Sequence, residues 1–332
     1  MELRIAVAGI RHGHIFALVN DVQKRSDARI VACCEEDAAA RSGAPASVTV
    51  THESFDRMLA EVPCDAVAIG DYYAKRGTLA IAALKAGKHV IADKPLCTAE
   101  NELKEIGKLA AKKKLRVGLM LDLRDAPVSR TIRSVIQSGS IGEVHAVSFG
   151  GQHPLNFGSR ASWYFEEGKH GGTNNDIAIH GLDLIPWLIG KPIARIDAAR
   201  NWNGALKQVP HFRDCAQVML TLDGGCGVMG DVSYLSPDSF GYSFPHYWKY
   251  MFWGSGGVIE ASNTTGQVLL YRNGTKAAEQ VPLVAGVPGG YLASFLSDVQ
   301  NPGSGEMSMP DILESSRWTL KAQILADKRS EG

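Results

Sequence analysis

The sequence predicts an α/β fold in two parts: a doubly wound parallel sheet, followed by an α+β domain with an open-faced, mostly antiparallel sheet. Two observations support this prediction. Short apolar runs alternate with helical patterns up to about residue 120, and longer strand patterns with few helices follow. We expect residues 1–121 to form the first domain and residues 122–332 to form the second.

Six short apolar runs are expected as strands of the first sheet: RIAVAG, RIVACC, SVTV, DAVAIG, KHVIAD and LRVGLML. Helical patterns lie between them at residues 16–24, 55–61, 74–86 and 100–112. The runs are nearly continuous in Val, Ile, Ala and Leu. Helices are therefore expected to cover both faces of this sheet.

The pattern changes after a helix that is expected to end near Gly139. The expected later strands include VHAVSFGGQ, RIDAARNW, AQVMLTL and YWKYMFWG, and helical patterns at 291–299 and 312–327 close the chain. Both alternating faces of YWKYMFWG are aromatic or apolar. One face is expected to cover the core and the other to contact a neighbouring subunit, which predicts a homodimer or homotetramer through this sheet.

Composition excludes several classes of partner. The chain has 332 residues, and its 35 basic and 35 acidic side chains cancel, so no net field draws it to nucleic acid or to an anionic membrane. No run of about 18 apolar residues is present, and the start MELRIAVAG lacks a signal-peptide pattern. We expect a cytoplasmic protein with a small-molecule partner. The six cysteines form no CxxC pair and are expected to be reduced.

The segment IAVAGIRHGHI reads as a strand, a tight turn and the start of a helix. Gly9 follows the strand, Gly13 lies four residues later, and Arg11 and His14 stand where a GxGxxG pattern has its second and third glycines. A guanidinium could then lie beside a pyrophosphate at the helix N-terminus, although an ordinary turn without a ligand gives the same pattern. His12 and His14 form an H-x-H pair, but no third ligand is near in sequence, so no metal site is expected.

The run RIVACCEED ends in acids about twenty residues after this turn. We expect Glu35 to accept hydrogen bonds from an adenosine ribose. Glu36 and Asp37 add two more carboxylates that would repel a 2′-phosphate, which favours NAD over NADP unless Arg41 folds back. The alternative is a solvated acidic turn that opens a helix.

Two further segments carry titratable side chains. GKHVIADKPL places Asp93 and Lys94 at the carboxyl end of a strand, the edge where doubly wound sheets bind ligands, although a surface lysine is the simpler alternative. GGTNNDIAIHGLD places Asp176 and His180 four residues apart on one face of an apolar helix. Such a pair needs mutual pairing in a core, a metal or a wet cavity.

Four segments in this order resemble the Gfo/Idh/MocA family of glucose–fructose oxidoreductase and inositol dehydrogenase: IAVAGIRHGHI, ALKAGKHVIADKPL, SGSIGEV and GGTNNDIAIHGLD. The resemblance implies an NAD(P)-binding Rossmann domain joined to an open-faced sheet, with the nicotinamide between them. It also implies three catalytic roles. Lys94 would hydrogen-bond the substrate hydroxyl, Asp176 would orient the substrate, and His180 would take or return the hydroxyl proton.

The sequence also departs from the family pattern. Asp93 stands where Glu is usual, and IGDYYAKRG replaces a TPN-like segment, which would bring Asp71 and Arg76 near the nicotinamide. Arg76 could then hold a cofactor phosphate or a substrate acid. The candidate cofactor-binding residues are Gly9, Arg11, His12, Gly13, His14, Glu35, Asp71, Arg76, Asp93 and Lys94. Trp163, Tyr164 and Asp183 are candidate substrate residues, with packing in the sheet as the alternative for the two aromatic residues.

We therefore expect an NAD-dependent dehydrogenase, with NADP the less favoured cofactor, acting on a secondary hydroxyl of a sugar or cyclitol-like polyol. Two other functions remain open from the sequence. An NAD-retaining glycosidase of similar fold would use the same residues up to the first hydride transfer. A non-catalytic sensor of cofactor and sugar would not need a proton acceptor beside a lysine.

Overall fold

The computed structural model describes residues 2–330, which divide into two compact units. The first unit contains residues 2–120, 161–171 and 289–317, and the second contains residues 121–160, 172–288 and 318–330. The first change of unit lies one residue before the boundary expected from the sequence. The chain then returns twice to the first unit, in segments that the sequence analysis placed in the second domain.

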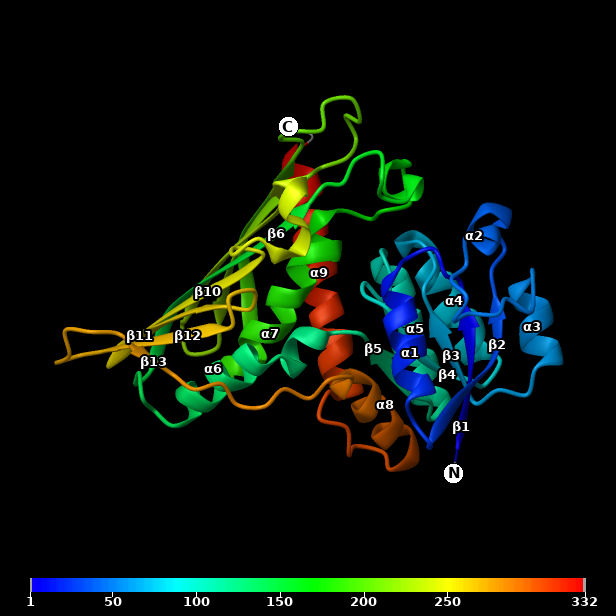
Figure 1. Cartoon of the computed structure of the whole chain (residues 1–332), viewed down its shortest axis with the longest axis horizontal. Helices are drawn as coiled ribbons and strands as arrows, with labels where there is room; N and C mark the ends of the chain where they lie inside the picture. The colour runs from blue at the N-terminus through cyan, green and yellow to red at the C-terminus, as the bar shows by residue number, and fades with distance from the viewer. Residues whose placement is uncertain (1, 331–332) are drawn as a thin grey trace. The chain divides into compact units, whose positions relative to one another are not determined.

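The sheet of the first unit has five parallel strands in the order β2-β1-β3-β4-β5 (Figure 1). Their bounds are β1 Leu3–Ala8, β2 Ala28–Cys34, β3 Ala66–Ile69, β4 His89–Ala92 and β5 Val117–Leu119. Every residue of β3 and β5 is buried, as expected for strands covered on both faces. The predicted doubly wound sheet is confirmed.

Helices connect these strands and cover the sheet. They are α1 His14–Gln23, α2 Ala38–Ser42, α3 Phe55–Glu61, α4 Tyr73–Lys85 and α5 Glu100–Lys113. Two returning segments add to the same unit. The short helix η2 Ser162–Phe165 brings two aromatic rings, and α8 Gly290–Gln300 packs against β5, where Phe295 lies so close to Gly118 that a Cβ at that glycine would come within 2.8 Å of the ring.

The expected strand at SVTV, residues 47–50, is wrong. Residues 47–50 belong to no strand, and an isolated bridge between Cys34 and His52 follows them. The backbone N–H groups of Thr51 and His52 donate to the carbonyl of Cys33, and the Thr51 hydroxyl bonds both the N–H and the carbonyl of that residue. The contact with β2 therefore comes just after the predicted run, and Ser54 soon caps α3 by accepting from the N–H of Arg57.

The second unit is built on eight strands in the order β13-β12-β11-β10-β6-β9-β8-β7. Only β6 and β9 pair in parallel, which confirms the mostly antiparallel sheet. The bounds are β6 Val144–Pro154, β7 Ile193–Trp202, β8 Cys215–Leu222, β9 Gly227–Ser236, β10 Trp248–Gly254, β11 Gly257–Ser262, β12 Gln267–Arg272 and β13 Glu279–Gln280.

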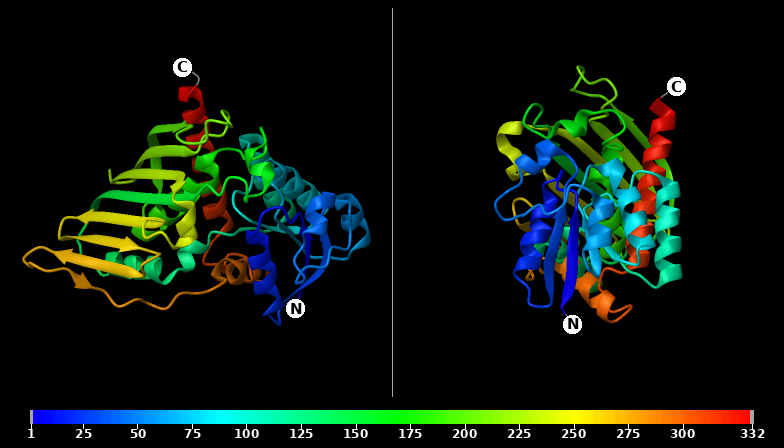
Figure 2. Two further views of the ribbon diagram at one scale, coloured as in Figure 1. Left: turned by 45° about the horizontal axis from the view of Figure 1, so that its top comes forward. Right: turned by 90° about the vertical axis from the view of Figure 1, so that its right-hand side faces the viewer.

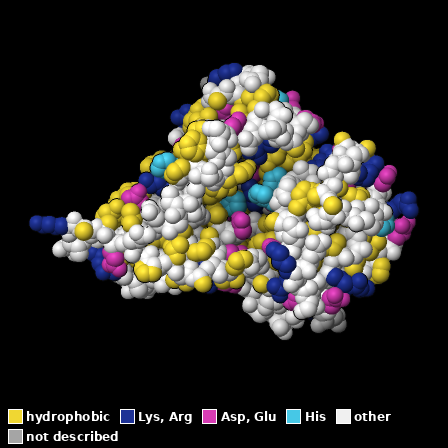
Figure 3. All heavy atoms as spheres, viewed as in Figure 1, with side chains coloured by type: hydrophobic (Ala, Val, Ile, Leu, Met, Phe, Trp, Pro, Cys, Tyr) yellow, Lys and Arg dark blue, Asp and Glu magenta, His cyan; other side chains and the backbone are white. Residues whose placement is uncertain are grey.

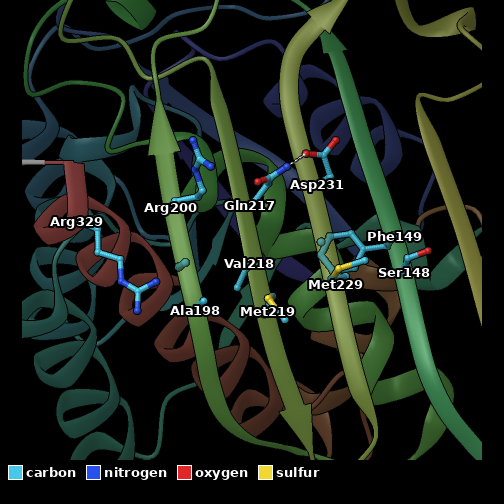
Figure 4. A pocket seen from close by; sticks show the side chains of 12 residues that line it. Ser148, Phe149, Ala198, Arg200, Gln217, Val218, Met219, Met229, Asp231 and Arg329 are labelled. Carbon is cyan, nitrogen blue, oxygen red and sulfur yellow. Dashed lines mark hydrogen bonds between the residues drawn. The ribbon is translucent and has the colours of Figure 1, made fainter.

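Helices cover one face of this second sheet (Figures 1 and 2). They are η1 Asp122–Asp125, α6 Pro127–Gln137, η3 Asn174–Ala178, α7 Ile179–Ile189 and the later part of α9 Met309–Ser330, and η4 Asp238–Ser243 lies in a connection. The other face is open, as Figure 4 shows, with Met219 and Met229 49% and 57% exposed in a shallow pocket. The strand predicted to contact a neighbouring subunit, YWKYMFWG, forms β10 of this sheet, and that contact stays a prediction.

Charge and apolar length agree with the expectations from composition. Basic and acidic side chains are interspersed over the face seen in Figure 3, without a large area of one sign. Within residues 2–330, no helix combines the length and the apolar character that crossing a membrane requires. All six cysteines are buried and free in the structure.

Candidate functional site

The turn between β1 and α1 needs glycine at Gly9. Its φ is +77°, and a Cβ there would lie 2.5 Å from the Cβ of Asp71. Gly13 is the N-cap of α1, and no described atom lies within 4 Å of where its Cβ would be. The N–H groups of Ile15 and Phe16 donate to the carbonyls of His12 and Gly13 at 3.2 Å each, and α1 has no acidic side chain in its first turn. The open space at Gly13 would leave room for a pyrophosphate at this end of α1, and that contact stays a prediction.

Arg11 is held by carboxylates that follow β2 and β3. Its guanidinium lies 3.1 Å from Asp37, 3.5 Å from Glu35 and 3.6 Å from Asp71, and it stacks 5.3 Å from the ring centre of Tyr72. Its side chain is only 16% exposed. Arg11 stands where a GxGxxG pattern has its second glycine, and its positive charge is balanced by these three carboxylates.

Glu35 is completely buried and accepts hydrogen bonds of 2.8 Å from the backbone N–H groups of Ile10 and Asp37. It therefore ties the turn to the end of β2, and its role toward a ribose stays a prediction. The side chains of Glu36 and Asp37 are 43% and 40% exposed, and they pair with Lys75 at 2.7 Å and with Arg11 at 3.1 Å. Arg41 does fold back, but it bonds the carbonyls of Glu35 and Glu36.

The segment after β4 is clamped by Arg76. This guanidinium is fully buried and donates to the carbonyls of Asp93, Lys94 and Pro95 at 2.8, 2.5 and 3.3 Å, and to the carboxylate of Asp93 at 2.8 Å. A further bond of 2.8 Å reaches the carbonyl of Asp71. The geometry makes Arg76 a positioning residue for Lys94, which differs from the expected contact with a cofactor phosphate. The Lys94–Pro95 peptide is cis.

Asp93 joins this segment to the turn. Its Oδ2 accepts from Nδ1 of His12, and its Oδ1 lies 3.3 Å from Nδ1 of His14. On the far side of the His12 ring, Nε2 lies 3.2 Å from the Tyr73 hydroxyl, which lies 2.8 Å from the Tyr164 hydroxyl. Burial lowers the pKa of His12 to about 4, so a neutral imidazole bridges Asp93 and Tyr73 at pH 7.

Trp163 and Tyr164 lie in the first unit, in the buried aromatic cluster with Tyr73. Each is 4% exposed, their rings stack with centres 4.1 Å apart, and the Trp163 indole donates to the carbonyl of Arg11 at 3.1 Å. Their position agrees with the packing alternative, although they pack on the turn between β1 and α1 and not in the second sheet. No sequence pattern could predict this contact, because 152 residues separate the donor and acceptor.

Asp176 and His180 lie at the start of the buried helix of the second unit, where η3 is a π-helical turn that precedes α7. The Tyr234 hydroxyl donates to Asp176, and the His180 ring packs edge-on against Trp248 with centres 5.4 Å apart. Both side chains are buried. Single π-helical turns are rare and occur frequently at functional sites, and the sequence pattern did not predict this one.

Asp183, a candidate substrate residue, instead forms a buried two-bond pair with Arg124. The guanidinium donates to its two carboxylate oxygens at 2.7 and 2.5 Å. This pair joins α7 to η1 within the second unit, which is a structural role. Of the expected catalytic residues, Lys94 belongs to the first unit, and Asp176 and His180 belong to the second.

Comparisons with known proteins match both units. Residues 3–120 match the model of an oxidoreductase family with an NAD-binding Rossmann fold, and residues 129–260 match the GFO/IDH/MocA C-terminal domain. A levoglucosan dehydrogenase from Pseudarthrobacter phenanthrenivorans is 30% identical over 46% of this chain and 40% of its own length. An inositol 2-dehydrogenase from Saccharopolyspora erythraea is 25% identical over 73% of this chain and 70% of its own. The chain spans 40 to 52% of the length of the first three curated relatives that it matches.

Solved structures share the fold over nearly the whole chain. An oxidoreductase from Agrobacterium radiobacter in complex with NAD+, L-tartaric acid and magnesium has a TM-score of 0.81 at 18% identity, covering 99% of this chain and 97% of its own. An aldose-aldose oxidoreductase from Caulobacter crescentus complexed with glycerol has a TM-score of 0.79 at 17% identity, covering 99% and 98%. The two family models, which together match more than half of the chain, show that it belongs to the Gfo/Idh/MocA family of oxidoreductases, whose first domain is an NAD-binding Rossmann fold.

Proposed function

We propose that this protein is an NAD-dependent dehydrogenase that oxidises a secondary hydroxyl of a sugar or cyclitol-like polyol. One observation carries the proposal: Asp93 contacts both His12 and His14 of the dinucleotide turn, and Lys94 is the next residue. Lys94, which carries the ammonium group, therefore follows β4 at the edge of the sheet where α1 begins, and this N-terminus is the proposed pyrophosphate site. The names of the inositol and levoglucosan dehydrogenases support this class of substrate.

Each proposed catalytic residue has a separate task. Bound NAD supplies the hydride acceptor. Lys94 hydrogen-bonds the substrate hydroxyl and stabilises negative charge on its oxygen as the proton leaves. His180 accepts that proton, since an imidazole is basic enough at neutral pH and still returns the proton in the reverse direction.

Asp176 orients the substrate through a neighbouring hydroxyl group. The Tyr234 hydroxyl fixes the rotamer of this carboxylate by donating to it. The clamp by Arg76 does the same for the backbone of Lys94. Both supports hold reacting groups in place before substrate binds, which lowers the cost of ordering them during reaction.

The test is a panel of aldoses, inositols, 1,6-anhydrosugars and nitrophenyl glycosides incubated with NAD. We expect NADH to accumulate with at least one polyol, and the His180→Asn variant to lose about 10²- to 10⁴-fold in kcat with unchanged affinity for NAD. His145→Asn, an exposed position on β6, is the matched control and should behave as the wild type.

Three outcomes would contradict the proposal. Equal rates for the His180→Asn and His145→Asn variants would remove the proposed base. Release of nitrophenol without accumulation of NADH would indicate an NAD-retaining glycosidase. Tight NAD binding without turnover over the whole panel would indicate a sensor.

A further inference from the structure

Three side chains with metal-ligating atoms meet in the first unit. His12, His14 and Asp93 each offer one ligand atom, and the three atoms lie within 4.8 Å of one another. The sequence analysis expected no metal because the H-x-H pair lacks a third ligand nearby in the chain. The fold supplies that ligand from the end of β4, 79 residues after His14.

We propose that His12, His14 and Asp93 bind one divalent transition-metal ion, with Zn²⁺ the best fit to the donor set. Two imidazole nitrogens and one carboxylate oxygen are ligands that Zn²⁺ commonly takes in proteins. Ligand atoms around a tetrahedral zinc ion lie about 3.4 Å apart, because each is about 2.1 Å from the metal. The observed distance between His14 Nδ1 and Asp93 Oδ1 is 3.3 Å.

The surroundings orient two of the three ligands. The other ring nitrogen of His12, Nε2, lies 3.2 Å from the Tyr73 hydroxyl, so with Nδ1 on the metal the Nε2–H can donate to Tyr73. Tyr73 in turn can donate to Tyr164 at 2.8 Å. Arg76 holds the Asp93 carboxylate from its other side at 2.8 Å. Outer partners of this kind fix the tautomer and the orientation of metal ligands.

Arg76 also sets the strength of the site. The Arg76 guanidinium would share the Asp93 carboxylate with the metal ion, and its positive charge would repel that ion. We therefore expect weaker metal binding than in a closed structural zinc site. The His14 side chain is 53% exposed, which leaves at least one coordination position open to solvent. Three protein ligands with an open position are typical of a metal that binds a water or a ligand oxygen.

The zinc site shares the β1–α1 turn with the cofactor site of the proposed function, but its test measures metal binding and needs no turnover. The test uses the full chain, stripped with a chelator and titrated with Zn²⁺ alone by calorimetry, followed by elemental analysis after dialysis. We expect one zinc ion per chain in the wild type and in the control His145→Ala. His14→Ala should bind at least 100-fold more weakly, and Tyr73→Phe about 10- to 100-fold more weakly.

A second measurement needs no variant. Zn²⁺ should protect His14 of the unaltered chain from diethyl pyrocarbonate, and Mg²⁺ at the same concentration should not, because it prefers oxygen ligands. Absence of bound zinc, or equal affinity of His14→Ala and His145→Ala, would overturn the proposal. Zinc binding without any NAD-linked turnover would support this site and contradict the proposed function, whereas turnover without zinc binding would do the reverse.

Discussion

The guanidinium of Arg76 donates to the carboxylate of Asp93 at 2.8 Å, and neither side chain is exposed to solvent. The guanidinium beside this carboxylate, with His12 on its other side, holds the pKa of Asp93 well below its usual range although burial acts in the opposite direction. Asp93 is therefore ionised inside the protein. The pair links α4 to the end of β4, where Lys94 lies.

Removing one partner of this pair should destabilise the protein strongly. We expect Arg76→Met to lower the free energy of unfolding by about 3 to 5 kcal/mol, because it leaves a buried carboxylate without its compensating charge. Urea unfolding followed by tryptophan fluorescence measures this. The control is Arg57→Met on α3, whose guanidinium is 73% exposed and pairs with Glu61, and it should cost under about 1 kcal/mol. Similar costs for the two variants would refute the role given to Arg76.

The buried cysteines should react slowly with thiol reagents. Burial raises the pKa of Cys33, Cys34, Cys97 and Cys215 to about 12, and it also raises the pKa of Cys64 and Cys226. At pH 8 the thiolate fraction of the first four is about 10⁻⁴, compared with about a quarter for an ordinary thiol. Labelling by iodoacetamide should be about a thousandfold slower in the native chain than in urea, and faster as the pH rises. Rapid labelling of the native chain at pH 8 would contradict this.

The cofactor preference follows from the acids after β2. The half-exposed side chains of Glu36 and Asp37 should repel a 2′-phosphate, and Arg41 cannot easily compensate because it also pairs with Glu53 at 3.4 Å. We expect kcat/KM with NAD to exceed that with NADP by at least about tenfold, which corresponds to about 1.4 kcal/mol.

Steady-state kinetics of Asp37→Ser should show a smaller ratio between the two cofactors. Asp56→Ser, which removes an exposed acid of α3 on the same unit, should leave the ratio unchanged. A wild-type enzyme that prefers NADP would contradict this, because it would show that attraction of the 2′-phosphate by Arg41 outweighs repulsion by Glu36 and Asp37.

The open face of the second sheet should mediate self-association. Met219 and Met229 are exposed there in the pocket of Figure 4, and apolar side chains grouped in this way mark interfaces. We expect the wild type to sediment as a dimer or tetramer of the 35.7 kDa chain. Met229→Glu should shift it to the monomer, and Leu283→Glu, 42% exposed in a loop, should not. A monomeric wild type at micromolar concentration would contradict this interface.

Local patterns predicted most elements of the fold. The apolar spacing of residues 55–61 predicted α3 with the bounds that the structure shows, and the runs RIAVAG, RIVACC and KHVIAD were found as β1, β2 and β4. SVTV failed because strand propensity cannot show that the contact with β2 is made by Thr51 and His52, just after the run. The π-helical turn at Asp176 was not predicted either, because a single extra residue in a helix leaves no clear periodic signal in the sequence.

The contacts around the candidate site were less predictable, because they join residues far apart in sequence. The pattern placed His12, Arg76 and Asp93 near one edge of the sheet, but it could not show that the arginine points inward to the carbonyls or that Asp93 lies against His12. Side-chain direction depends on packing, and periodicity reports only the face of an element. The same limit applies to Trp163, which approaches the turn from a returning segment.

The segments that return to the first unit have a consequence for biosynthesis. The ring cluster of Tyr73 is completed by residues 161–171, and the cover of β5 by residues 289–317. A ribosome that has released only the first 120 residues has therefore exposed a five-stranded sheet whose apolar surface is still partly bare. Stable burial of that surface awaits the synthesis of residues 289–317, so a gene fragment cut after residue 120 should yield an aggregating product and not an autonomous nucleotide-binding module.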